Sequence, residues 1–234
     1  MKQILTYISP DHEFNEEHKM AVKIQIDNSL RLGWRREDIL LVTNFPYEYN
    51  GVKACVIRDD NYCPFHWPAT KIYVICKLFR MGMIKKDVFW YHDFDCFQLN
   101  KFDEDVLGDA DMGVTNYGRM PRLCSASIFF KESSRDIFIR LKDLIDESKQ
   151  GEESRMTNLA EIEPRIKKLN ITYAFHKFNL VHCYARADKP IKAAHFHLTP
   201  DKYDFYVKGN NNLNKVLIPQ GLIDIFNKHG WTEQ

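Results

Sequence analysis

The feature that most constrains this chain is a short apolar run that ends in two closely spaced aspartates. Residues 88–91 read Val-Phe-Trp-Tyr, and one histidine separates them from Asp93 and Asp95. β-Branched and aromatic residues in such a run predict a buried strand. Two carboxylates this close repel each other, and a divalent cation is the usual compensator. The sequence therefore predicts a metal site at Asp93 and Asp95, with a pair of turn-forming aspartates as the alternative.

The rest of the chain alternates predicted strands and helices. The apolar patterns predict strands at 3–9, 38–43, 52–57 and 88–91, with helices at 13–32 and 68–83 between them. Continuous apolar strands in this order favour an α/β fold with a mixed, mostly parallel central sheet and helices on both faces. Ligands of such sheets bind beyond the carboxyl ends of the strands, and the aspartate pair lies at such an end.

The second half of the chain predicts further elements of the same kind. Strands are expected at 111–115, 124–131, 171–174, 180–183 and 191–198, and helices at 135–147 and 217–229. Residues 152–169 carry another helical pattern, in which Pro164 predicts a kink or break. No linker is evident, so residues 1–234 are expected to form a single domain.

Composition restricts the class of protein. The formal net charge is +1, which indicates no general attraction to nucleic acid. No apolar run is long enough for a signal peptide or a membrane span, and the six cysteines lack C-x-x-C spacing. These features predict a soluble cytoplasmic protein with reduced thiols.

The aspartate pair and a later histidine segment together resemble the GT-A fold glycosyltransferases, which have a Rossmann-like sheet and use nucleotide-diphosphate sugars. Asp93 and Asp95 stand where that family has its D-x-D motif, at the end of a central strand. His195 and His197 resemble the late strand that supplies a further metal ligand, and either can be that ligand. The resemblance implies Mn²⁺ or Mg²⁺ as cofactor, and it places Lys202 roughly where glycogenin-type enzymes have a phosphate-binding lysine.

Other residues at the predicted strand ends complete a candidate donor site. Tyr7 can stack on a nucleobase or pack in the core, while Lys71 opens the second predicted helix. The resemblance implies base or ribose contacts for the acidic pair after the third strand. The arginines of the loop 116–122 can clamp phosphate or acceptor. The nucleotide-sugar-binding set is Thr6, Tyr7, Ser9, Asp59, Asp60, Lys71, Asp93, Arg119 and Lys202.

A second acidic pair provides a candidate for catalysis. Glu152 and Glu153 begin a predicted helix, and the resemblance implies that such a helix start faces the acceptor. An inverting enzyme needs a carboxylate general base for the acceptor hydroxyl, so Glu153 and Asp93 are the predicted catalytic residues. The alternative is that both glutamates favour the helix dipole. Donor binding is assigned to residues of about 1–100 and acceptor binding to about 101–234.

The resemblance implies metal-dependent transfer of a hexose or pentose from a nucleotide-diphosphate sugar, most commonly a UDP-sugar, to an acceptor hydroxyl. The acceptor is either a glycan or, as in compact phage-encoded arabinosyl- and glucosyltransferases, a hydroxymethylated base in DNA. Two other classes remain open. One is a nucleotidyltransferase, although residues 9–12 do not form a glycine-rich loop. The other is a non-catalytic nucleotide-binding protein.

Overall fold

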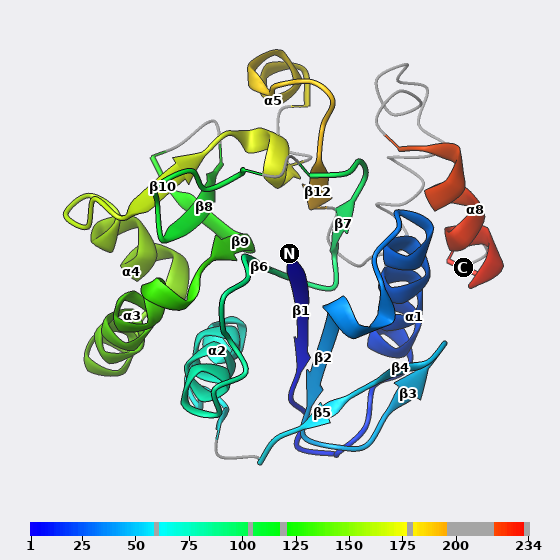
Figure 1. The fold of residues 1–234 in the computed structure, drawn as a ribbon, viewed down its shortest axis with the longest axis horizontal. Coiled ribbons are helices and arrows are strands. Elements are labelled where there is room, and N and C mark those ends of the chain that lie inside the picture. Colours follow the sequence, from blue (N-terminus) through cyan, green and yellow to red (C-terminus); the bar gives the residue numbers. More distant parts are fainter. Residues whose placement is uncertain (59–60, 103–104, 118–120, 177–179, 196–217, 232–234) are drawn as a thin grey trace.

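The computed structural model of the protein describes residues 1–58, 61–102, 105–117, 121–176, 180–195 and 218–231. Seven strands form a central sheet in the order β10-β8-β9-β6-β1-β2-β5 (Figure 1). Strand β9 runs antiparallel to both of its neighbours, and all other adjacent pairs are parallel. The predicted mixed, mostly parallel α/β sheet is therefore confirmed. Its strands are β1 (Lys2–Tyr7), β2 (Ile39–Thr43), β5 (Cys55–Val56), β6 (Phe89–His92), β8 (Met112–Asn116), β9 (Leu123–Phe130) and β10 (Ile166–Leu169).

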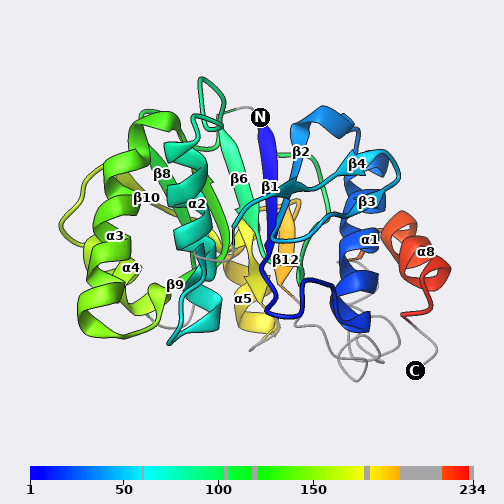
Figure 2. The ribbon, with the colours of Figure 1, turned by 90° about the horizontal axis from the view of Figure 1, so that it is seen from below.

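Helices cover both faces of this sheet, as the alternation predicts. Ile4 and Leu5 are neighbours in β1 and point to opposite faces. Ile4 packs in the cluster that contains the apolar sides of α2 (Thr70–Arg80) and α3 (Arg135–Ser148), whereas Leu5 packs with α1 (Glu16–Arg31). Figure 2 shows α2 and α3 on one side of the central strands and α1 on the other.

A second, three-stranded sheet lies beside the central one. It consists of β11 (Phe175–His176), β12 (Ala193–His195) and β7 (Cys96–Gln98), with β12 in the middle. Strand β7 follows the aspartate pair directly, so this small sheet brings the late histidine strand close to the end of β6. The helix α8 (Gln220–Lys228) packs on α1 and shares an apolar cluster with this sheet (Figure 1).

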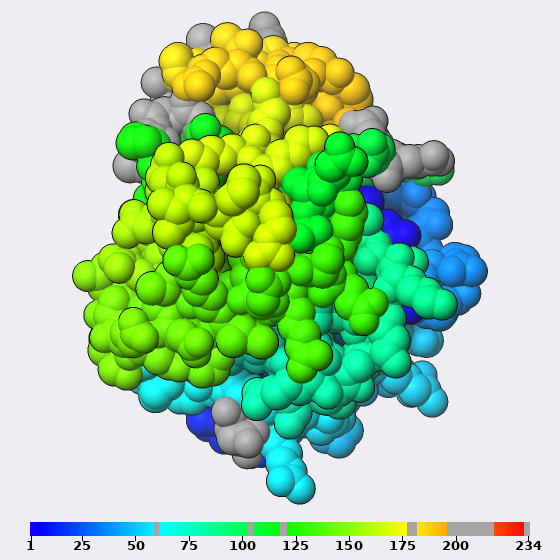
Figure 3. All heavy atoms as spheres, turned by 60° about the vertical axis from the view of Figure 1, so that its left-hand side comes forward, coloured from blue at the N-terminus to red at the C-terminus, as the bar shows by residue number. Residues whose placement is uncertain are grey.

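The remaining elements are short. Strands β3 (Glu48–Tyr49) and β4 (Val52–Lys53) form a two-stranded hairpin, and α4 (Glu152–Leu159) follows α3. In Figure 3 the green and yellow surface over α3, α4 and β10 forms one face of the molecule, with the segment of α5 (Leu180–Arg186) at its upper end. Within the described residues, 3₁₀ turns lie at Arg36–Asp38, Trp67–Ala69, Glu132–Ser134 and Ile171–Tyr173.

Several predicted elements of the second half are wrong. The helical pattern over 152–169 ends at Leu159, and residues Ile166–Leu169 form the edge strand β10. Pro164 prevents the helix from continuing. The residues of β10 are in turn buried, exposed, exposed and buried, so its sequence does not show the alternation expected of a strand. Residues 171–173 form a 3₁₀ turn rather than a strand, and the apolar run at 180–183 belongs to helix α5. Short apolar runs do not distinguish a strand from a helix segment.

The described helices include none that is both long and apolar enough to cross a bilayer. All six cysteines are free thiols, and five of them are buried.

Candidate active site

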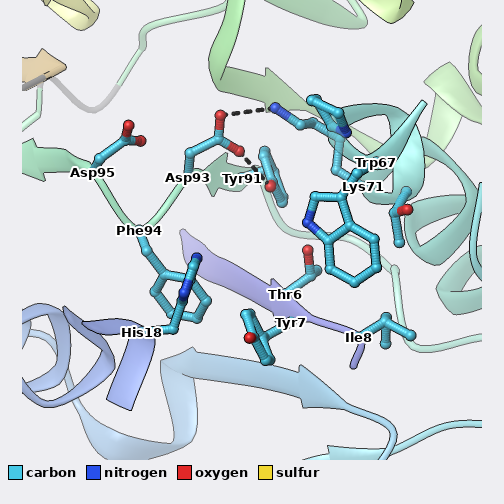
Figure 4. A pocket seen from close by; sticks show the side chains of 12 residues that line it. Thr6, Tyr7, Ile8, His18, Trp67, Lys71, Tyr91, Asp93, Phe94 and Asp95 are labelled. Carbon is cyan, nitrogen blue, oxygen red and sulfur yellow. Dashed lines mark hydrogen bonds and ion pairs between the residues drawn. The ribbon is translucent and has the colours of Figure 1, made fainter. Parts of the chain in front are cut away.

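A cavity of about 210 Å³ opens where β1 and β6 end. These strands are parallel neighbours, so their carboxyl ends meet at one edge of the sheet, as the sequence predicts. The start of α2 closes the cavity on one side. Figure 4 shows the lining side chains, which are Thr6, Tyr7, Ile8, His18, Trp67, Pro68, Thr70, Lys71, Tyr91, Asp93, Phe94 and Asp95.

Asp93 is held by two donors inside this cavity. Nζ of Lys71 lies 2.8 Å from Oδ2 of Asp93, and the hydroxyl of Tyr91 donates to Oδ1 at 2.6 Å (Figure 4). Both oxygens of this carboxylate are therefore oriented by side chains from α2 and β6. The arrangement fixes the orientation of the first of the two predicted metal-binding aspartates.

The cation that holds Asp93 is itself buried. Lys71 is 5% exposed, and Nζ also lies 3.2 Å from Oγ of Ser125 and 3.7 Å from Oε1 of Glu152. Burial alone would lower the pKa of Lys71, but the charge of Asp93, followed by Tyr91 and Glu152, outweighs it and raises the pKa well above its ordinary value. Lys71 is thus a fixed positive charge of the cavity and not a solvated surface lysine.

Asp95 has a different partner. Its Oδ2 lies 3.1 Å from Nε2 of His195, which β12 brings to the end of β6 across the three-stranded sheet. The second aspartate therefore contacts the histidine strand. Figure 4 shows its side chain on the far side of Asp93 from Lys71. Burial by itself lowers the pKa of His195, but the negative charge of Asp95 raises it well above the ordinary value.

The donor set at Asp95 and His195 fits a divalent cation. An octahedral cation with bonds of about 2.1 Å holds adjacent ligand atoms about 3 Å apart. The carboxylate oxygen and the imidazole nitrogen lie 3.1 Å apart at the edge of the cavity. An oxygen ligand combined with an imidazole suits Mn²⁺ better than Mg²⁺.

The histidine that precedes the motif belongs to the core. His92 is 1% exposed, and its ring contacts the carbonyl of Cys96 and the side chain of Gln3. Burial lowers the pKa of His92 to about 3, so the ring is neutral. It braces the turn between β6 and β7 that presents the two aspartates.

The two glutamates at the start of α4 face different partners. Glu152 is 2% exposed and accepts a hydrogen bond from Oγ of Ser125 at 2.7 Å, in addition to its contact with Lys71. Glu153 accepts hydrogen bonds from the hydroxyl of Tyr117 at 2.9 Å and the backbone of Ser125 at 3.1 Å, and pairs with Arg122 at 3.3 Å. Glu152 therefore belongs to the Lys71 network, and Glu153 lies on its outer side.

Aromatic rings form the opposite wall of the cavity. Tyr7 lies 4.7 Å from the His18 ring, 6.5 Å from Trp67 and 6.1 Å from Phe94, measured between centroids. Trp67 is 44% exposed, which leaves part of its face open to the cavity. The wall offers ring surfaces on which a flat base or the apolar face of a sugar can pack.

The residues predicted to bind the nucleotide sugar lie only partly in the cavity. Thr6, Tyr7, Lys71, Asp93 and Asp95 line the cavity. Ser9 is 5% exposed, and its backbone N–H and C=O bind the side chain of Asn44, so it shapes the loop after β1. The predicted site residues outside the described part of the chain are Asp59, Asp60, Arg119, His197 and Lys202.

Sequence reasoning missed four residues that the fold brings to this site. Tyr91 reads as one more apolar residue of its strand, and Ser125 as one residue of another. Trp67 and His18 come from segments far apart in the chain. The position of Tyr91, two residues before Asp93, was the one available signal, because alternate residues of an extended segment share a face.

Comparison with known proteins identifies the fold. No protein-family model and no curated protein sequence matches the chain. Solved structures do match. A galactosyltransferase LgtC in complex with donor and acceptor sugar analogues aligns with 96% of this chain and 100% of its own, at a TM-score of 0.59 and 10% identity.

Two further structures show the same similarity. Mouse xyloside xylosyltransferase 1 aligns with 83% of this chain and 96% of its own, at a TM-score of 0.52 and 12% identity. A glycosyltransferase involved in the glycosylation of the major capsid of PBCV-1 aligns with 89% of this chain and 100% of its own, at a TM-score of 0.52 and 10% identity. The protein has the GT-A fold, and the function must be argued from the site.

Proposed function

We propose that this protein is a metal-dependent glycosyltransferase that moves a sugar from a nucleotide-diphosphate sugar to an acceptor hydroxyl. The observation that carries the proposal is the spacing of 3.1 Å between Oδ2 of Asp95 and Nε2 of His195 at the edge of the cavity. A carboxylate and an imidazole so placed, next to a fixed Lys71–Asp93 pair, form a cation site that can hold a diphosphate. The glycosyltransferase structures of the same fold support the same reading.

Each wall of the cavity has a role in this proposal. The aromatic wall of Tyr7 and Trp67 receives the nucleobase, for which we propose uracil. Asp95 and His195 hold Mn²⁺ or Mg²⁺, which when bound neutralises charge on the leaving diphosphate. Asp93 is held in one orientation by Lys71 and Tyr91, so it can accept hydrogen bonds from ribose or sugar hydroxyls without a cost for reorganisation.

The acceptor side is assigned to the second half of the chain. In this proposal one domain has a donor half at about 1–100 and an acceptor half at about 101–234, because Ser125 of β9 and Glu152 of α4 contact Lys71, which lines the cavity. Glu153 is the proposed base for the acceptor hydroxyl. Its carboxylate already accepts from Tyr117 and Ser125, so an acceptor must replace one of these donors.

We favour a sugar over a modified base in DNA as the acceptor. A DNA acceptor predicts a basic rim with a salt-dependent affinity. Arg122 pairs with Glu153 at 3.3 Å, and this ion pair compensates the charge of the arginine. The free thiols fit a cytoplasmic location. The two other candidate functions are a nucleotidyltransferase and a non-catalytic binding protein, and the following experiment can also support either of them.

The test is a thermal shift assay with Mn²⁺, a panel of nucleoside diphosphates and nucleotide sugars, and the variant Asp95→Asn. We expect a nucleoside diphosphate, and most strongly UDP, to raise Tm only when Mn²⁺ is present, since a ligand stabilises the state that binds it. Asp95→Asn should abolish this shift. The matched control Asp143→Asn, which changes an exposed carboxylate of α3, should retain it.

The outcomes separate the alternatives. No shift with any nucleotide, or an equal shift in Asp95→Asn, would contradict the proposal. Binding followed by hydrolysis of one nucleotide sugar names the donor. Incubation of that donor with oligosaccharides and with DNA that carries hydroxymethylated bases then identifies the acceptor, and binding without turnover of any donor indicates a non-catalytic protein.

A further inference from the structure

Three buried side chains of types that can ligate a metal form a cluster next to Asp95, which lines the cavity. Cys124, His176 and His195 are 0%, 2% and 7% exposed, and one ligand atom of each lies within 4.8 Å of the others. Sγ of Cys124 is 3.8 Å from Nδ1 of His195, and the two imidazole rings meet edge to face at 4.6 Å. The proposed function uses one nitrogen of His195 and neither of the other two residues.

The fold brings these residues together from three strands. His176 of β11 and His195 of β12 are register partners in a parallel pair, so their side chains lie on the same face of the three-stranded sheet. Cys124 lies in β9, where the pairing with β8 shifts register between Val114 and Thr115. Such an irregularity re-aims the side chains of a strand, and here the thiol lies beside the histidine pair.

We propose that Cys124, His176 and His195 bind a soft divalent cation of the zinc class, separately from the hard cation of the donor site. Zinc combines thiolate and imidazole ligands in tetrahedral sites. With bond lengths of about 2.3 Å to sulfur and about 2.0 Å to nitrogen, such ligands lie about 3.4–3.6 Å apart. The 3.8 Å between Cys124 and His195 is near this value, and a separation of 4.8 Å within the cluster would have to shorten by about 1.2–1.4 Å on binding. Binding releases the thiol proton of Cys124 and any proton on Nδ1 of His195.

His195 has the surroundings of a zinc ligand. Metal-bound histidines usually donate the other ring N–H to a carboxylate, which orients the ring. Here Nδ1 faces Cys124, and Nε2 faces Oδ2 of Asp95 at 3.1 Å. The three protein ligands leave the fourth position of a tetrahedral zinc ion to a water molecule or an added ligand.

The two metal sites compete for His195, and this consequence rests on the proposed function. A neutral imidazole has one nitrogen with a lone pair and one that carries a proton. Zinc on Nδ1 places the proton on Nε2, which can then donate to Asp95 but cannot bind the donor-site cation. Zinc at the cluster therefore weakens Mn²⁺ binding at the cavity.

The test measures zinc binding without any nucleotide. Metal-free protein is titrated with Zn²⁺ in competition with a chromophoric chelator, for the wild type, Cys124→Ser, His176→Asn and the control Cys76→Ser, a buried thiol of α2. We expect one zinc per chain in the wild type and in Cys76→Ser, and at least a tenfold weaker affinity in the other two. An affinity for zinc that is unchanged in Cys124→Ser and His176→Asn would overturn the proposal.

Cobalt provides a readout that does not depend on how the variants fold. Co²⁺ bound to the wild type should give a thiolate-to-metal charge-transfer band, and the absence of that band would overturn the proposal. Failure of the proposed function is distinguishable, because it appears as the loss of Mn²⁺-dependent nucleotide binding while zinc still binds. If both sites are real, Zn²⁺ should raise the apparent Kd for Mn²⁺ in the wild type and not in His176→Asn.

Discussion

Two aspartate–lysine pairs in this protein have nearly the same geometry and opposite surroundings. Lys71 lies 2.8 Å from Asp93, and Lys228 lies 2.7 Å from Asp27. The side chain of Lys71 is 5% exposed, whereas that of Lys228 is 61% exposed. In the first pair the cation is buried and the carboxylate reaches the cavity. In the second the carboxylate is buried and the cation reaches water.

The burial of the lysine or the aspartate indicates the role of each pair. A buried ammonium must be compensated, so Lys71 needs Asp93 and Glu152, and the pair holds a charged wall ready for a ligand. Asp27 lies in α1 and accepts from Lys228 and His229 at the end of α8, so that pair joins two helices that are about 200 residues apart in the chain. One pair serves the site, and the other serves the assembly of the fold.

Removal of the buried cation should have the largest effect. Lys71→Met leaves Asp93 and Glu152 without their compensating charge, and we expect a loss of about 3 kcal/mol in the free energy of unfolding. Urea denaturation measures this loss. Nucleotide-sugar binding should fall in the same variant, because Asp93 is no longer oriented.

Lys77→Met is the matched control, since Lys77 lies in the same helix and is half-buried. It should cost under about 1 kcal/mol. A Lys71→Met variant as stable as this control would show that the buried pair contributes nothing beyond packing.

The second pair should have a smaller and pH-dependent effect. Burial raises the pKa of Asp27, but hydrogen bonds from Lys228, His229 and Asn50 outweigh it and lower the pKa below 3.8. A carboxyl whose pKa is lower in the folded state stabilises it above the unfolded pKa, and this stabilisation is lost as pH falls through the folded value. Asp27→Asn should therefore cost about 1–2 kcal/mol above pH ~5 and progressively less below pH ~4.

Urea denaturation of Asp27→Asn and wild type between pH 3 and pH 7 measures this difference, with Asp224→Asn, an exposed carboxylate of α8, as the control. A difference that stays constant over the whole range would rule out the charge of Asp27 as its cause.

Removal of the exposed cation, Lys228, should have the smallest effect on the free energy of unfolding. Lys228→Ala removes a largely solvated partner, and His229 still contacts Asp27 at 2.9 Å. Surface ion pairs contribute about 0–1 kcal/mol, so the expected loss is about 0.5 kcal/mol. Its dependence on salt, followed by thermal denaturation at low and high ionic strength, checks the electrostatic origin. A loss as large as that of Asp27→Asn would mean that Lys228 alone joins the helices.

Long apolar patterns predicted the first half of the fold well. The strand before Asp93, the two long helices α1 and α2, and the shared edge of β1 and β6 are all present, because a long apolar pattern identifies its element without help from neighbouring segments. The second half was predicted less well. There the elements are four residues or fewer in several cases, and their conformation depends on neighbours rather than on period.

The candidate site shows the same limit. Asp93 and Asp95 were selected from residue type and strand position, and His195 or His197 from the resemblance; the fold brings Asp95 and His195 to 3.1 Å. The sequence named Glu153 as the notable acid of α4, yet Glu152 is the one buried against Lys71. A helix turns by about 100° per residue, so only the packed helix decides which of two adjacent glutamates faces the site.

The amino-acid sequence was enough to predict a mixed, mostly parallel sheet, the edge of that sheet where polar groups gather and the carboxylates that end β6. These features follow from the period of the apolar pattern and from the direction of the strands. The tertiary structure alone decided that Lys71 is buried beside Asp93, and that Cys124 and His176 meet His195. These contacts join residues from 19 to 71 positions apart, which no local pattern relates. The first contact is an ion pair withdrawn from water and the second depends on the pairing of β11 with β12, and both require the folded chain.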